Sequence, residues 1–313
     1  MTIRSIRLPR FLMPLGKLVV VPLLLWMIGR NALPGAGVGA ITADYVYIVI
    51  ALVANQAALY VFAVRMHITL GIFGIPISSF QAQRIHLQSV FYYFALPMTV
   101  GLEVSRFAKV RYLVGDGVSG LTLGSALLLD RLIGAVAALS ITVALFPFVS
   151  IRTVVNWNAY WPLIILLSLA VLATAWFFRH RVRDLLSRTL DLIKVNKRQL
   201  WAALFVSILT HVFFACGVFA GGEAFSLHIS FAQTLFVVSA AMLFVVFPLS
   251  FAGISPVEAA AFGLLVALGL PENQALIFVL ITYFAKLVAA FEGACWEFFE
   301  GGRGFLQSFD RGG

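Results

Sequence analysis

The sequence predicts an all-α polytopic membrane protein, and three observations support this fold class. Of the 313 residues, 62% are hydrophobic and only 11% are charged, and the mean hydropathy is +1.01. A soluble domain carries about 25% charged residues, so a surface this apolar is favourable only against hydrocarbon. Several apolar runs reach the roughly 20 residues that a spanning helix needs. These runs are too long for barrel strands and do not alternate, which argues against a β-barrel.

The first half of the chain is predicted to hold three crossing helices and one broken helical hairpin. The crossing helices are expected at about 11–28, 45–64 and 121–148. Between the last two lies a short apolar run over 90–100, which is interrupted by Pro97 and followed by Gly101. At 1.5 Å per residue this run spans only about half a bilayer. We therefore expect a re-entrant hairpin, with its break near 90–112, that enters and leaves on one side.

Residues 151–313 are predicted to repeat the arrangement of residues 1–150. Crossing helices are expected at about 161–178, 200–221 and 274–298, which makes about six in the whole chain. The stretch near 232–270 is again broken, because Pro248 ends one apolar piece and Ser255 begins the next. The sequence thus predicts about six full crossings and two re-entrant hairpins.

Two short sequence matches relate the halves. Leu-Pro-Met-Thr at 96–99 resembles Phe-Pro-Leu-Ser at 247–250, and Arg-Leu-Ile-Gly-Ala at 131–135 resembles Lys-Leu-Val-Ala-Ala at 286–290. Because three crossings reverse the direction of the chain, the second half would be inverted in the membrane. Inverted repeats with paired broken helices are typical of transporters, whose site lies near the midplane.

The basic residues predict the orientation. The formal net charge is +9, and many of the lysines and arginines lie in 178–199. By the positive-inside rule this segment and both termini are expected in the cytoplasm, with Arg65 at the inner end of the second helix and 35–39 outside. We expect a multi-pass protein of the cell membrane, namely the bacterial inner membrane. No aromatic-basic platform accompanies the charge, so no nucleic-acid partner is predicted.

Neither the cysteines nor the histidines have the spacing of metal ligands. Cys216 and Cys295 lie in apolar runs and are expected to be packed, reduced thiols. The histidines show no ligand pattern, and no glycine-rich phosphate loop or nucleophile elbow occurs. The sequence therefore predicts no metal site, no cofactor and no catalytic residue.

Ionisable side chains within the apolar segments are the candidate substrate-binding residues. Six are selected: Glu103, Arg106, Asp130, Arg131, Glu258 and Lys286. Each costs about 2.5–3.5 kcal/mol to insert, so it is expected to face a cavity or a partner. The cations can hold a phosphate or carboxylate headgroup, and the carboxylates can orient them. The alternative is that these groups only pair with one another. Since adjacent helical residues point about 100° apart, Asp130 is expected to pair with another helix.

The broken helices are predicted to contribute backbone to the same site. The residues concerned are Pro97, Gly101, Pro248, Ser250, Gly253 and Ser255. Residues 255–258, Ser-Pro-Val-Glu, fit a capping box, which alone explains the glutamate. A capped half-helix end inside the membrane is also an anion site, because its free N–H groups and dipole attract negative charge.

These motifs resemble those of a known family. Residues 96–109 are similar to its block of a proline, glycines, an acidic residue and an arginine, and 129–134 to its acidic-Arg-apolar-apolar-Gly block. Residues 248–258 resemble its Pro-x-Ser-x-Gly-Gly-x-Gly-x-Arg-Glu block. The family is the flippase-like membrane proteins that include the transmembrane region of bacterial lysyl-phosphatidylglycerol synthases. The resemblance runs from about 60 to 301.

The chain departs from the family pattern at three positions. Ala252 and Ser255 stand where the family usually has glycine, and Val257 stands where it often has arginine. Without that arginine, any headgroup contact it makes is lost. The sequence also shows no soluble aminoacyl-transferase domain, so the resemblance implies the flippase-like half and not the synthase activity.

The motifs and the resemblance predict a lipid translocator rather than an enzyme. It would move a phospholipid or polyprenyl-linked headgroup between leaflets through a polar cleft between the two repeats. The expected ligand is a membrane lipid with an anionic headgroup, and the expected protein partner is a lipid or glycan biosynthesis enzyme. Two alternatives stay open. One is a membrane-embedded transferase, which needs a poised catalytic base; the other is a non-transporting scaffold, in which the buried charges are dispensable.

Overall fold

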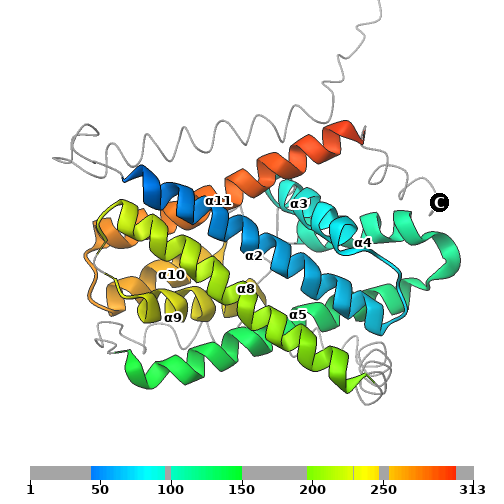
Figure 1. The fold of residues 1–313 in the computed structure, drawn as a ribbon, viewed down its shortest axis with the longest axis horizontal. Helices are drawn as coiled ribbons and strands as arrows, with labels where there is room; N and C mark the ends of the chain where they lie inside the picture. Colours follow the sequence, from blue (N-terminus) through cyan, green and yellow to red (C-terminus); the bar gives the residue numbers. More distant parts are fainter. Residues whose placement is uncertain (1–43, 96–99, 150–195, 228, 247–253, 301–313) are drawn as a thin grey trace, which may run out of the picture.

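The computed structural model describes residues 44–95, 100–149, 196–227, 229–246 and 254–300 (Figure 1). These ranges form eight α-helices and no strand: α2 (Tyr45–Ile72), α3 (Ser79–Ala95), α4 (Val100–Val114), α5 (Gly120–Leu145), α8 (Lys197–Ala224), α9 (Phe231–Met242), α10 (Pro256–Ala267) and α11 (Glu272–Phe299). Four of them, α2, α5, α8 and α11, are long and apolar enough to cross a membrane. The predicted all-α polytopic fold is confirmed. The crossings expected at 11–28 and 161–178 lie outside the described residues.

Helices α2 and α8 pack side by side and antiparallel at the centre of the fold (Figure 1). The backbone N–H of Asp44, which caps α2, donates to the carbonyl oxygen of Ala224 at the end of α8, at 3.2 Å. Gly217 permits the close approach, because a Cβ there would lie 3.0 Å from the carbonyl oxygen of Ala51. Small residues let helices in lipid approach closely enough for van der Waals packing to hold them together.

Each short helical pair lies toward one end of this central pair. Helix α3 packs on α4, and α9 packs on α10, and the two pairs lie toward opposite ends of the molecule (Figure 1). The packing is crossed: α3 contacts α11, and α9 contacts α5. The connections over 96–99 and 247–253 lie outside the described residues. An inverted repeat would produce this crossed packing, and the repeat itself stays a prediction.

The second crossing helix ends later than the sequence predicts. It was expected to end at 64 with Arg65 at the inner membrane surface, but α2 continues to Ile72 and Arg65 is buried. From the sequence, Arg65 was interpreted as the end of the helix, because its partner is distant in the sequence and lies on another helix. That partner, Asp130, compensates for the cost of burying the charge. The other described crossing helices agree with the prediction to within three residues at each end.

The contact between α3 and α11 gives a prediction about stability. A Cβ at Gly293 on α11 would overlap the carbonyl oxygen of Leu87 on α3. Gly293→Ala is therefore expected to push the helices apart and lower stability by about 1–3 kcal/mol, measured by denaturant unfolding in detergent. Gly124→Ala on α5 is the matched control, since nothing lies within 4 Å of its new methyl group. Equal stability of the two variants would contradict the close contact.

Candidate functional site

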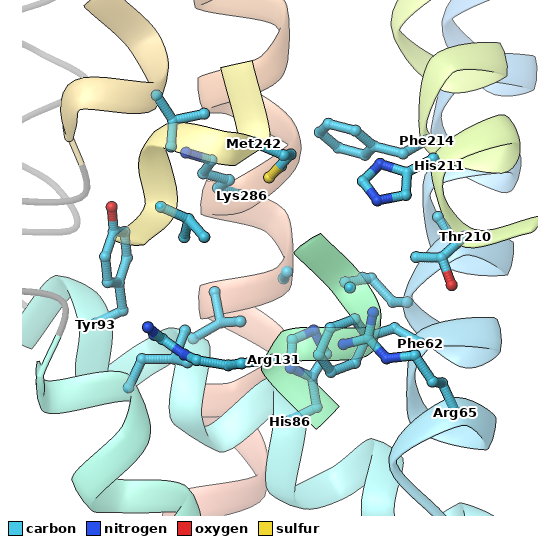
Figure 2. Close-up of a pocket in the computed structure, with 18 of the residues that line it drawn as sticks. Phe62, Arg65, His86, Tyr93, Arg131, Thr210, His211, Phe214, Met242 and Lys286 are labelled. Carbon is cyan, nitrogen blue, oxygen red and sulfur yellow. The ribbon is translucent and has the colours of Figure 1, made fainter. Parts of the chain in front are cut away.

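A cavity of about 280 Å³ lies inside the helical bundle, and all eight described α-helices contribute to its wall (Figure 2). Five of the predicted charged residues line it: Glu103, Arg106, Asp130, Arg131 and Lys286. The sixth, Glu258, lies behind Lys286 and contacts it. In Figure 2, the apolar side chains Phe214 and Met242 lie on the opposite side of the cavity from Arg65 and His86. In the same view Lys286 lies beside Met242 and His211 beside Phe214, so charged and apolar side chains are mixed in the cavity wall.

A buried ion pair joins α2 to α5 at the cavity wall. The guanidinium of Arg65 donates from Nε and Nη2 to the two carboxylate oxygens of Asp130, both at 2.9 Å. Its Nη1 donates to the hydroxyl of Ser207 on α8, also at 2.9 Å. The expectation that Asp130 pairs with another helix is confirmed. Because Arg65 and Asp130 are only 5% and 2% exposed, this pair fixes three crossing helices together.

Gly134 makes room for the Arg65 guanidinium. A Cβ at Gly134 would lie 2.9 Å from Nη1 of Arg65. The same guanidinium lies over the ring of Phe62, 4.3 Å from its centroid, which adds a cation–π contact. The glycine of the acidic-Arg-apolar-apolar-Gly block, Gly134, therefore leaves the space that the buried Arg65 side chain occupies.

A single carboxylate serves two arginines next to this pair. Oxygen Oε1 of Glu103 accepts from Nη1 of Arg106 at 3.2 Å and from Nε of Arg131 at 2.9 Å. The buried Nε of Arg106 has no hydrogen-bond partner among the described residues. The Arg131 side chain is 32% exposed, and its terminal nitrogens make no described hydrogen bond. Arg131 therefore keeps donors for a ligand, whereas the unpaired Nε of Arg106 is buried.

A second carboxylate and cation form a matching pair in the second half. Lys286 of α11 donates to Oε1 of Glu258, and the other oxygen of Glu258 accepts from the backbone N–H and hydroxyl of Ser255, both at 2.7 Å. The predicted capping box at the start of α10 is confirmed. The Glu258 carboxylate therefore has two roles: one oxygen caps the start of α10, and the other pairs with Lys286.

The two pairs occupy equivalent places in the two halves. In both pairs the carboxylate precedes the cation by 28 residues. Glu103 and Glu258 each lie in the first turn of the helix that follows a break, and Arg131 and Lys286 each lie on the next long helix. This correspondence favours the predicted repeat, and it brings Arg131 and Lys286 to one cavity from the two halves.

The predicted broken-helix residues are only partly described. Gly101 lies buried in the first turn of α4, and Ser255 lines the cavity at the start of α10. Pro97, Pro248, Ser250 and Gly253 lie outside the described residues. Within the described ranges, no group of three His, Cys, Asp or Glu side chains is placed to hold a metal ion. The absence of a metal in the function stays a prediction.

Three buried residues were not predicted as site residues from the sequence. Arg65 and His86 line the cavity, and Nδ1 of His86 lies 2.7 Å from Nη2 of Arg106. Glu297 belongs to a separate cluster, where it accepts from Nζ of Lys109 at 2.6 Å and from the Tyr92 hydroxyl at 2.9 Å. This cluster ties α3 and α4 to α11. In the sequence Lys109 lies in a short helix with three other charged residues, and Glu297 lies near the end of α11, so no pattern indicated that they pair.

The fold and the site define a helical, multi-pass membrane protein with a charged cavity inside its helical bundle. A family model for the transmembrane region of lysylphosphatidylglycerol synthase matches residues 15–291, so the chain belongs to this family. The resemblance found in the sequence is thereby confirmed, and with it a membrane lipid-related role. No curated protein and no solved structure matches the chain.

Proposed function

We propose that this protein is a lipid translocator, which moves an anionic lipid headgroup between the leaflets of the cell membrane. The observation that carries the proposal is the convergence of Arg131 and Lys286, from equivalent positions in the two halves, on one cavity within the membrane-spanning bundle. A cation in this environment is costly, so its retention favours a role in binding. The cavity takes the headgroup while the hydrocarbon tails stay in the lipid.

The exposure of the cations divides them into two kinds. The side chains of Arg65 and Arg106 are only 6% exposed, whereas those of Arg131 and Lys286 are 32% and 20% exposed. Arg131 and Lys286 therefore contact the headgroup, and Arg65 acts through the packing of its helix. A guanidinium binds phosphate through two parallel N–H···O bonds, and the terminal nitrogens of Arg131 have no described partner for this role.

The same proposal includes the membrane placement. We propose that the protein lies in the bacterial inner membrane, that both termini face the cytoplasm and that residues 1–150 and 151–313 form an inverted repeat. Alternating exposure of the cavity to the two sides would then follow from rocking of one repeat against the other. An enzyme of lipid or glycan biosynthesis remains the proposed protein partner, because it would supply or consume the translocated lipid.

The direct test is reconstitution of the purified protein in liposomes that contain a panel of fluorescent lipids. Added dithionite bleaches only the outer leaflet, so a translocator exposes the inner-leaflet label to bleaching, and the label is lost beyond one half. Ser140→Ala is the matched control, since Ser140 is exposed and its hydroxyl bonds only to the Val136 carbonyl of its own helix. We expect faster loss than in protein-free vesicles for at least one anionic lipid. Loss at the protein-free rate for every lipid would favour the scaffold.

A further inference from the structure

We propose that the cavity selects a lipid whose headgroup is a phosphodiester with a single negative charge. The inference rests on the proposed function in taking the cavity as the headgroup site. It narrows the class of headgroup that the cavity binds, because phosphate monoesters, diphosphates and zwitterionic headgroups are then poorer ligands. The charges at the cavity are expected to balance, because unpaired charge is costly in this part of the protein.

The described residues place one more cation than carboxylate at the cavity. Four cations line it: Arg65, Arg106, Arg131 and Lys286. Three carboxylates pair with them, namely Asp130 with Arg65, Glu258 with Lys286, and Glu103 with the two remaining arginines. One positive charge is therefore uncompensated. The connecting segments 96–99 and 247–253 contain no ionisable side chain.

The two histidines of the cavity do not add to the excess. Arginine has only donors, so the 2.7 Å contact from Nη2 of Arg106 requires Nδ1 of His86 to accept. An accepting Nδ1 carries no proton, and the His86 ring is neutral. His211 forms no ion pair with a carboxylate among the described residues, and an unpaired charge is costly inside the membrane, so its neutral ring is favoured. Among the residues that the structure describes, the net excess at the cavity is thus one positive charge.

The excess lies in the first half, at Arg106. The second half has an alanine, Ala261, three residues after Glu258, where the first half has Arg106 three residues after Glu103. Arg106 therefore adds a cation that has no counterpart in the second pair. Its Nε is buried without a partner, and it shares its carboxylate with the more exposed Arg131. One phosphate group bound by the exposed guanidinium of Arg131 would compensate the charge that the two arginines carry in excess of their shared carboxylate.

A single negative charge balances the site, and other headgroups do not. A phosphodiester carries one charge, so its binding leaves the cavity neutral. A phosphate monoester carries about −1.5 to −2 at pH 7, and a diphosphate carries more, so each leaves unpaired negative charge. A zwitterionic headgroup brings its own cation and leaves the positive excess unbalanced. Burial of an uncompensated charge is strongly unfavourable, so the charge balance of the cavity determines which headgroups bind tightly.

Binding to the purified full-length chain in detergent tests the inference without transport. The probes are phosphatidylglycerol, a polyprenyl phosphate bearing one sugar, the diphosphate of the same polyprenol, and phosphatidylcholine, with binding read by native mass spectrometry. We expect at least one of the two monoanionic diesters to bind about tenfold or more tightly than the diphosphate and phosphatidylcholine. The tighter of the two diesters identifies the lipid class. Equal or tighter binding of the diphosphate, or no binding of either diester, overturns the inference.

A charge variant provides the sharper test. Glu103→Gln leaves a second uncompensated cation, so the ratio of diphosphate to diester affinity is expected to rise about tenfold. Glu292→Gln is the matched control, because it removes one carboxylate from a membrane helix outside the cavity, where Glu292 bonds to Gln56. If Glu103→Gln does not fold, Arg131→Gln serves instead. It removes the excess charge, and the preference for the diester over phosphatidylcholine should vanish.

The outcomes separate this inference from the proposed function. Diester selectivity in a protein that does not transport lipid supports the headgroup site and contradicts the translocator. Transport without selectivity, or an unchanged affinity ratio in a folded Glu103→Gln protein, overturns the charge balance and leaves the translocator standing.

Discussion

Replacing Asp130 by alanine is expected to destabilise the protein by about 3–5 kcal/mol. The substitution leaves the Arg65 guanidinium buried without its carboxylate, at a position that is only 5% exposed. Arg65 would keep its bond to Ser207 but lose both of its 2.9 Å contacts to Asp130. Unfolding in detergent with increasing dodecyl sulfate, followed by circular dichroism, measures the loss. Ser140→Ala on the same helix provides the control.

A double variant separates charge from packing at this pair. Arg65→Met with Asp130→Leu removes both charges, and apolar replacement of a buried ion pair is often neutral or stabilising. We expect the double variant to recover most of the stability that Asp130→Ala loses. An Asp130→Ala protein as stable as the parent would contradict the structural role. A double variant as unstable as Asp130→Ala would assign the loss to packing.

The lengths of the helices were predictable because the bilayer sets them. Apolar runs in the sequence gave α5, α8 and α11 to within three residues, since a run that crosses hydrocarbon must stay apolar throughout. Arg65 is an exception, because its charge interrupts the apolar run of α2 and was interpreted as the end of the helix at the membrane surface. Its compensation comes from Asp130, which is distant in sequence and reaches Arg65 only through the packing of α2 on α5.

The membership of the site was predictable, but its internal pairing was not. Intramembrane charges must converge on partners or a cavity, and five of the six selected residues do line one cavity. Which carboxylate serves which cation depends on helix rotation, so the sharing of Glu103 by two arginines had no sequence signal. Glu297 was missed for a related reason. A charge near a helix end suggests a surface position, yet α3 and α4 pack over Glu297 and leave it only 1% exposed.

The largest functional effect is expected for Arg131→Lys, which should still fold and insert but translocate poorly. A lysine keeps the positive charge and the pairing with Glu103, but it lacks the planar fork that binds phosphate through two bonds. Loss of one hydrogen bond to a charged group costs about 1.5–3 kcal/mol, so the transport rate should fall about tenfold or more. Thermal stability and the dithionite assay are measured on the same preparation.

Lys286 supplies the complementary variants, because it holds the equivalent place in the second half. Lys286→Arg keeps the charge and adds donors, so it is expected to retain transport, whereas Lys286→Gln removes the charge opposite Glu258 and is expected to reduce it. Glu258 stays bonded to Ser255 in both variants, which limits the loss of stability. Transport at the parent rate in both Arg131→Lys and Lys286→Gln would mean that these cations are structural. Headgroup recognition would then lie elsewhere, and the scaffold would become the better explanation of the buried charges.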